Sequence, residues 1–278
     1  MREINKIIKG KTAVDGAGVK LVRVFGYYDV TDFDPFLMMD AFDSVNPSDY
    51  IKGFPWHPHR GIETVTYLIE GIIEHGDSLG NKGVIKDGDC QWMTGGSGII
   101  HQEMPKPANR MLGVQLWLNL PAKNKMTNPE YRDIINKNIP VVSAETSTIK
   151  IISGTYLDTT GALEGDYVKP LFMDIDLKPN QEFKMDTSED ETVYVYIIAG
   201  SAYFGTNKEI LVSEKQAVLF TYDLSFQMKS GEGGTRLLFL SGKPLKEPIA
   251  WGGPIVMNTR EELNQAFQDL DNGKFINR

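Results

Sequence analysis

Residues 63–71 have the sequence Glu63-Thr-Val-Thr-Tyr-Leu-Ile-Glu-Gly71, and a similar stretch, Glu191-Thr-Val-Tyr-Val-Tyr-Ile-Ile-Ala-Gly200, begins 128 positions later. Both are rich in β-branched and aromatic residues and end in glycine, which is typical of strands. Further along, Thr94 and Thr221 close a second pair of apolar segments at almost the same offset. We interpret the repeat as two copies of one β module, the alternative being chance similarity between strand-rich segments.

The remainder of the chain has the same strand-rich texture. Short apolar segments such as Gly18–Gly26, Gly113–Leu120 and Leu171–Leu177 lie between glycine, proline, asparagine or aspartate residues. This pattern predicts an all-β protein built from sandwiches or small barrels rather than alternating strands and helices. With 278 residues the chain is long enough for two such modules.

The expected module boundaries follow from the repeat. We expect an N-terminal module over residues 1–125 and a C-terminal module over residues 141–278. The segment 126–140 is polar and holds two prolines, so it is predicted to connect them.

Helix is predicted mainly at the end of the chain. Thr259 and Glu262 have the spacing of a capping box, and Gly273 supplies a stop. The apolar side chains between them recur at helical spacing: Leu263, Ala266, Phe267 and Leu270. A single amphipathic helix of this kind is expected to pack on its own sheet.

Composition and charge narrow the class of protein. There are 29 Lys and Arg against 37 Asp and Glu, a net charge of −8. An acidic chain without a basic run is poorly suited to nucleic acid or an anionic membrane surface. The single cysteine, Cys90, leaves no internal disulfide, and no apolar run is long enough for a signal peptide or a membrane span. We therefore expect a cytoplasmic protein.

All four histidines lie between residues 57 and 101. His57 and His59 stand two positions apart, and His101 and Glu103 repeat that spacing. Alternate residues of a strand share a face, so two antiparallel strands can bring these four side chains around one point. The pattern predicts a metal site, although a lone histidine of this kind is more often structural.

Three imidazoles and one carboxylate form a mixed nitrogen and oxygen donor set. Such a set suits a first-row transition metal and suits Mg²⁺ or Ca²⁺ poorly. We expect Fe(II), with Mn, Co, Ni, Cu or Zn as alternatives. An octahedral ion with four protein ligands keeps two positions open for a substrate and dioxygen.

Longer motifs around these histidines resemble the pirin family of the cupin superfamily. The resemblance rests on HPHRGIETVTYLIEG (57–71), FLMMDAFD (36–43), QLWLNLPAKNKM (115–126) and WGGPIVMNTREELNQAF (251–267). It implies a bicupin, that is, two tandem cupin-type β-barrels followed by a short C-terminal helix. It also implies a metal held only in the first barrel, by His57, His59, His101 and Glu103.

The second copy lacks the ligand residues. Aligning Glu63 with Glu191 places Met185 opposite His57 and Thr187 opposite His59, and the counterpart of His101 falls near Met228. We therefore expect one metal site in the chain.

The resemblance implies two different activities. One is that of a quercetin 2,3-dioxygenase, which opens a flavonol with O₂ and releases carbon monoxide. In this mechanism Glu103 is the catalytic residue that accepts the substrate proton. The other is that of a metal-dependent regulatory protein that binds transcription factors or metabolic enzymes. A third possibility is a cupin that binds a small molecule without turnover, and in each case we expect a monomer.

Roles for neighbouring residues stay open at this stage. Glu63 is interpreted as a carboxylate that supports or competes with the ligands, and His75 as a residue that contacts substrate or holds a loop. Phe54 and Met93 are expected to line the pocket, and Trp92 to lie in its wall or in the core. The glycines of 95–98 are expected to allow close backbone packing before the strand of His101.

Overall fold

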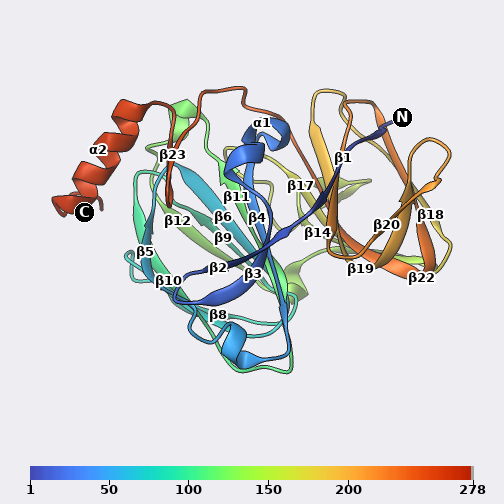
Figure 1. The fold of residues 1–278 in the computed structure, drawn as a ribbon, viewed down its shortest axis with the longest axis horizontal. Helices are drawn as coiled ribbons and strands as arrows, with labels where there is room; N and C mark the ends of the chain where they lie inside the picture. The colour runs from blue at the N-terminus through green and yellow to red at the C-terminus, as the bar shows by residue number, and fades with distance from the viewer. Residues whose placement is uncertain (277–278) are drawn as a thin grey trace. The chain divides into compact units, whose positions relative to one another are not determined.

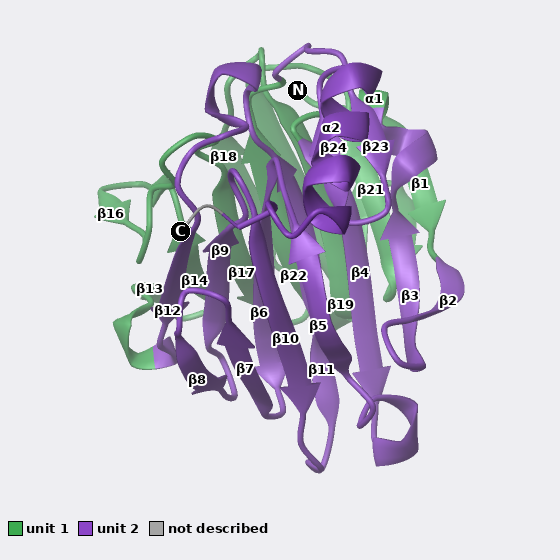
Figure 2. Ribbon diagram, turned by 90° about the vertical axis from the view of Figure 1, so that its left-hand side faces the viewer, with its two compact units in different colours: residues 1–10, 31–35, 137–244 green, residues 11–30, 36–136, 245–278 purple. Residues whose placement is uncertain are grey.

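The computed structural model describes residues 1–276 and consists mainly of strands (Figure 1). The predicted all-β class is confirmed. Contacts within the chain form two compact units, coloured separately in Figure 2. Unit 1 comprises residues 1–10, 31–35 and 137–244, and unit 2 comprises 11–30, 36–136 and the chain from Leu245 onward.

Unit 2 contains a seven-stranded and a four-stranded sheet, both antiparallel. In sheet order, the larger is formed by β12 (Glu130–Ile134), β9 (Cys90–Thr94), β6 (Ile62–Glu70), β11 (Met111–Asn119), β4 (Phe36–Ser44), β3 (Val19–Phe25) and β2 (Lys11–Asp15). The smaller is formed by β5 (Phe54–His59), β10 (Ile99–Pro105), β7 (Ile73–Asp77) and β8 (Lys82–Ile85). Buried and half-buried residues alternate along β10, which places Ile99, His101 and Glu103 on one buried face.

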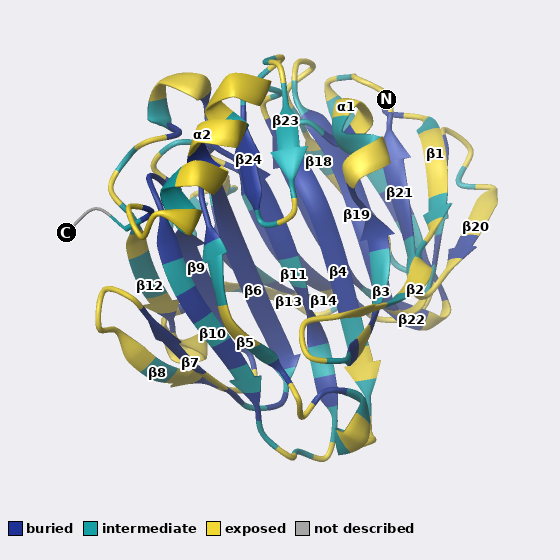
Figure 3. Cartoon of the chain, turned by 60° about the vertical axis from the view of Figure 1, so that its left-hand side comes forward, coloured by how far each residue is buried: buried dark blue, intermediate teal, exposed yellow. Residues whose placement is uncertain are grey.

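Unit 1 is built around one nine-stranded sheet. Its main path is β1 (Ile4–Lys9), β21 (Gln216–Phe220), β19 (Thr192–Phe204), β22 (Ser225–Gly242), β17 (Leu171–Leu177), β14 (Ser147–Ser153) and β13 (Val141–Ala144), while β18 (Glu182–Asp186) pairs with β22 and β20 (Ile210–Ser213) with β19. A small hairpin joins β15 (Thr155–Tyr156) to β16 (Thr159–Thr160). The core of unit 1 is apolar and rich in phenylalanine, including Phe204, Phe220, Phe226 and Phe239. Figure 3 shows the central strands of this unit as buried.

Short helical turns lie in the connections between strands. They are η1 (Tyr27–Asp29), α1 (Val30–Phe33), η2 (Pro47–Asp49), η3 (Ala122–Asn124) and η4 (Asn136–Asn138).

The repeated segments occupy equivalent places in the two units. In unit 2, β6 lies between β9 and β11, and in unit 1, β19 lies between β21 and β22. The strand pair β5 and β10 likewise corresponds to β18 and β22. His57 is paired with His101 in the first, and Met185 with Phe226 in the second. The residue opposite Met185 is therefore Phe226, two positions before the expected Met228.

The contacts divide the chain differently from the expected ranges 1–125, 126–140 and 141–278. Residues 4–9 form β1, which pairs with β21 and so joins unit 1. The polar segment 126–140 contains β12, whose backbone pairs with β9 and whose Ile134 is buried in unit 2. The chain after residue 244 also packs in unit 2. Backbone pairing and a few buried apolar side chains determine which unit each of these segments joins. This holds even for 126–140, which is polar as a whole.

The C-terminal helix α2 spans Arg260–Asp271, with the predicted capping box at its start. The Thr259 hydroxyl accepts a hydrogen bond from the Glu262 N–H over 3.1 Å, and the Glu262 carboxylate accepts one from the Thr259 N–H over 3.0 Å. The helix packs on β23 (Ala250–Gly252) and β24 (Ile255–Met257), so its partners belong to unit 2. No helix within residues 1–276 is both long and apolar enough to cross a bilayer.

Candidate metal centre

Three of the four predicted ligands meet at the pairing of β5 with β10. His57 lies directly opposite His101 in the antiparallel register, and His59 lies opposite Ile99. The ring centroids of His57 and His101 are 4.3 Å apart, and those of His59 and His101 are 5.1 Å apart. One nitrogen from each ring lies within 4.8 Å of the others. The strand spacing thus places three imidazoles around one point.

Backbone carbonyls orient two of these rings. Nδ1 of His57 lies 2.9 Å from the Pro55 oxygen, and Nδ1 of His59 lies 3.1 Å from the Pro254 oxygen. A carbonyl can only accept a hydrogen bond, so each Nδ1 must carry the proton. In both rings Nε2 is left with its lone pair, the form in which imidazole binds a metal.

His101 provides the test of whether these residues fit a metal. Its side chain is 1% exposed, and within residues 1–276 neither ring nitrogen has a hydrogen-bond partner. A buried polar atom without a partner costs about 1–3 kcal/mol. An ion bound between the three rings would supply a partner for one of these two nitrogens, so the donor set fits a transition metal.

Burial also favours the metal-binding protonation state. It lowers the pKa of His59 to about 3, with the neighbouring His57 as a smaller cause, and it lowers the pKa of His101 well below its ordinary value. Both rings are therefore neutral at neutral pH. Because a protonated imidazole cannot bind a metal, burial holds these two rings in the form that a metal requires.

Glu103 lies two positions after His101 on the same face of β10, and it is 3% exposed. Its Oε1 accepts a hydrogen bond from the Thr66 hydroxyl over 3.0 Å, and its Oε2 accepts one from Gln115 Nε2 over 2.8 Å. Among the described residues the compact donor cluster contains the three histidines and no carboxylate. Each Glu103 oxygen retains a second lone pair for a metal or a proton. Its role as the fourth ligand stays a prediction.

A small cavity lies beside Glu103 in unit 2. Its volume is about 30 Å³, and its wall is mostly apolar. The residues that line it are Val19, Leu21, Asp40, Phe42, Tyr50, Phe54, Thr66, Ile73, Glu103, Pro105, Met111 and Gln115. Phe54 lines this cavity, and Met93 and Trp92 are buried but do not line it.

Glu63 and His75 lie outside the histidine cluster. Glu63 is fully buried, and its Oε1 accepts a hydrogen bond from the Thr94 hydroxyl over 2.7 Å. His75 Nε2 lies 2.6 Å from the Tyr131 hydroxyl, and the two rings stack with centroids 4.5 Å apart. These contacts join β6 to β9 and β7 to β12, so they stabilise the two sheets that carry the site.

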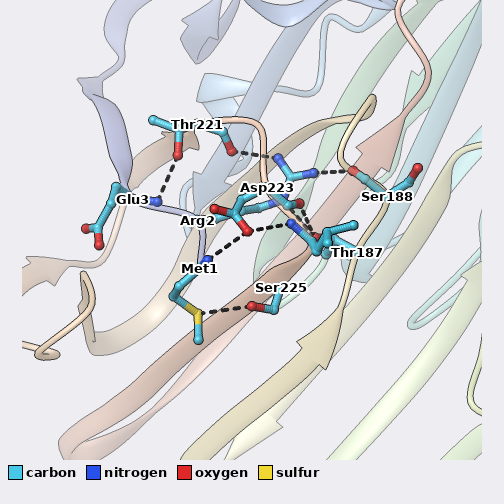
Figure 4. Close-up of polar contacts among 9 residues, drawn as sticks. Met1, Arg2, Glu3, Thr187, Ser188, Thr221, Asp223 and Ser225 are labelled. Carbon is cyan, nitrogen blue, oxygen red and sulfur yellow. Dashed lines mark hydrogen bonds and ion pairs between the residues drawn. The ribbon is translucent and has the colours of Figure 1, made fainter.

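The corresponding place in unit 1 is filled differently. Met185 and Phe226 contribute to the apolar core there, and Thr187 accepts a hydrogen bond from Arg2 Nε over 2.8 Å (Figure 4). The buried Arg2 guanidinium also donates to the carbonyl oxygens of Ser188 and Thr221. An arginine side chain thus binds the residue that corresponds to His59. The sequence pattern gave no signal for this contact, because Arg2 lies 185 positions away from Thr187.

Two protein-family models match this chain. The Pirin family model matches residues 18–118, and the model of the Pirin C-terminal cupin domain matches residues 172–276. The chain belongs to the pirin family. A pirin-like protein of Caulobacter vibrioides is 41% identical over 287 residues, covering 99% of both chains, and human pirin is 35% identical, covering 98% of this chain and 93% of the other.

Two solved structures share the fold of this pirin. A quercetin 2,3-dioxygenase from Acinetobacter baumannii has a TM-score of 0.90 and 33% identity, covering 99% of this chain and 98% of the other. A bacterial pirin from Escherichia coli, solved in complex with nickel(II), has a TM-score of 0.67 and covers 86% of this chain and 98% of its own. At 18% identity the second comparison shows the shared fold alone.

Proposed function

We propose that this pirin is a metal-dependent dioxygenase that opens a flavonol such as quercetin with O₂. The observation that carries the proposal is the cluster of His57, His59 and His101, whose nitrogens lie within 4.8 Å of one another beside the buried Glu103. The quercetin 2,3-dioxygenase name of a structural relative at 33% identity supports the same reaction class.

The residues divide into metal-binding and proton-handling roles. A transition metal bound here would supply Lewis acidity, which lowers the pKa of the flavonol 3-hydroxyl. His57 and His59 would hold it through Nε2, and His101 would hold it through one of its two ring nitrogens. Glu103 is the fourth ligand and accepts the 3-hydroxyl proton on a carboxylate oxygen. Thr66 and Gln115 orient that carboxylate by the two hydrogen bonds that it accepts.

The cavity beside Glu103 is lined by none of the three histidines, and its volume of about 30 Å³ is far too small for a flavonol. A flavonol that reaches Glu103 from this side would therefore require side chains to move, and apolar residues such as Phe54, Ile73 and Met111 would then contact its rings. His57 is the most exposed of the three histidines, so the open approach to the cluster lies on its side.

The ion itself is tested first. We expect Fe(II) in the native protein and binding of Mn, Co, Ni, Cu or Zn on reconstitution, because the donor set accepts each of them. Elemental analysis of the purified protein gives the identity and stoichiometry, with one ion per chain as the expected result. A chain that binds no transition metal would contradict the proposal.

Turnover is tested on protein loaded with each metal in turn. O₂ uptake with quercetin and release of carbon monoxide are expected, and both should be abolished in His101→Ala and strongly reduced in Glu103→Gln. Gln227→Leu is a suitable control, because Gln227 donates only to backbone oxygens of unit 1.

A null result on a flavonol panel would reject the enzymatic proposal and favour the metal-dependent binding function. Pull-downs with metal-loaded and metal-free protein would then follow. A partner retained only by the loaded form is the result that this second function predicts.

A further inference from the structure

The end of β5, from His59 to Gly61, is in contact with a segment almost 200 positions further along the chain. His59 Nδ1 donates to the Pro254 oxygen over 3.1 Å, and the Val256 N–H donates to the Arg60 oxygen over 3.1 Å. A Cβ at Gly61 would lie 2.0 Å from the Val256 oxygen, so only glycine permits this approach. The segment 254–256 therefore lies directly against the end of β5.

Arg60 extends these contacts to the helix and to the second ligand strand. Its side chain is 3% exposed, and Nε donates to the Ser97 oxygen over 2.7 Å, just before β10. Nη1 donates to the Asp269 carboxylate on α2 over 2.7 Å, and Nη2 donates to the Phe275 oxygen over 3.1 Å. The guanidinium carbon also lies 4.3 Å from the centre of the Phe275 ring. One side chain thus joins β5, the approach to β10 and the C-terminal segment.

Two further contacts tighten the same junction. A Cβ at Gly98 would lie 2.3 Å from the Phe275 oxygen, so the chain entering β10 packs against residue 275 without space between them. The buried Lys125 ammonium donates to the Gly61 oxygen over 2.8 Å and to the Val256 oxygen over 2.9 Å. Both strands that carry histidines are therefore fixed at their ends by the chain beyond residue 253.

We propose that residues 254–276 are a positioning element of the metal centre. They fix the protonated nitrogen of His59 through Pro254, and they hold β5 and β10 in register through Arg60. This inference rests on the proposed metal site. It assigns to the first cupin module a segment that the family models place in the C-terminal cupin domain.

A reciprocal effect follows from this arrangement. If the segment holds His59 and His101 in the geometry that binds an ion, then the bound ion must stabilise the segment by the same free energy. Partners that orient metal-binding histidines typically contribute 10–100-fold to metal affinity. Loss of the Arg60 contacts is expected to weaken binding by a factor in that range.

The experiment compares metal affinity in two arginine variants. Arg60→Met removes the hydrogen bonds to Ser97, Asp269 and Phe275 and keeps an apolar side chain of similar reach. The matched control is Arg236→Met in unit 1, whose Nε and Nη2 bind Asp174 over 2.9 and 2.6 Å. Competition between the protein and a chromogenic chelator for Co²⁺ gives the affinity, and the visible spectrum of bound Co²⁺ reports the coordination geometry.

The proposal expects Arg60→Met to bind Co²⁺ 10–100-fold more weakly than the control, with a changed spectrum. Asp269→Asn, a milder change, should give a smaller loss in the same direction and covers the case in which Arg60→Met fails to fold. Hydrogen exchange in α2 should slow when Co²⁺ is added to the wild-type chain.

Two opposite outcomes are distinguishable. Wild-type affinity and spectrum in both Arg60→Met and Asp269→Asn, with α2 exchange unaffected by Co²⁺, would overturn the positioning role alone. A wild-type chain that binds no Co²⁺ would overturn the metal centre itself.

Discussion

Gln115 Nε2 lies 2.8 Å from Oε2 of Glu103, and this bond joins β11 of one sheet to β10 of the other. We predict that Gln115→Leu weakens metal binding, because Glu103 then loses the donor that fixes its second oxygen. A loss of about 10–100-fold in affinity is expected from the removal of such a contact. Chelator competition measures it.

The same titration on Gln227→Leu controls for the loss of an amide in a β-sheet. Since Gln227 lies in unit 1, its variant should bind metal like the wild-type protein. Equal affinity in Gln115→Leu and the wild-type protein would show that Glu103 does not depend on this bond, or is not a ligand.

A second prediction concerns the apolar core of unit 1 at the place that corresponds to the histidine cluster of unit 2. Phe226 is completely buried and packs against Phe183, Phe204, Phe220 and Phe239. Phe226→Ala should lower the free energy of unfolding by about 3–5 kcal/mol through lost burial and the resulting cavity. Urea denaturation measures this loss. Metal content should stay at the wild-type value, and a matching loss of metal would contradict a purely structural role.

Arg2 gives a third prediction. In Arg2→Met the carbonyl oxygens of Ser188, Glu191 and Thr221 lose the hydrogen bonds that the guanidinium donates. Each such bond contributes about 0.5–1.5 kcal/mol, so a total loss of at least about 1.5 kcal/mol is expected. Thermal unfolding of the metal-free protein tests it. An unchanged midpoint would mean that water replaces the guanidinium without cost.

A fourth prediction concerns pH. The Arg60 guanidinium, and then Gln265, lower the pKa of Asp269 below its ordinary value. Because the folded pKa is the lower one, this carboxylate contributes stability above its unfolded pKa of about 4 and loses that contribution as the pH falls through the folded value.

Asp269→Asn should therefore be less stable than the wild-type protein at about pH 6, and the difference should shrink as the pH falls through the lowered pKa of the folded carboxylate. Unfolding midpoints measured across that range test the prediction. A difference between the two proteins that does not change with pH would contradict it.

The sequence could predict whatever depends on local periodicity. Local spacing predicts the strands with alternating or continuous apolar residues and the capping box at Thr259. Spacing along two strands also predicts the grouping of His57, His59 and His101. Spacing also indicated that Glu103 shares a face with His101, and the structure places both on the buried face of β10.

Contacts between distant parts of the chain could not be predicted in this way. Nothing in the local sequence of Arg60 identifies Asp269 as its partner, and nothing near Thr187 indicates Arg2. The positions of β1, β12 and the segment after residue 244 depend on the same kind of long-range pairing. Thr66 and Gln115, which donate to Glu103, could not be predicted from the sequence. Polar residues in strands have no distinguishing pattern until the positions of their strands are known.

The contact of Pro254 with His59 has a consequence for biosynthesis. The ribosome makes His57, His59 and His101 early, but it completes Phe275 only 174 residues after His101. At roughly 5–20 residues per second this interval is on the order of 10–35 s. During that time the nascent chain holds the three histidines without Pro254, which orients His59, and without the segment that Arg60 contacts. An ion captured in this interval would therefore meet an incomplete site.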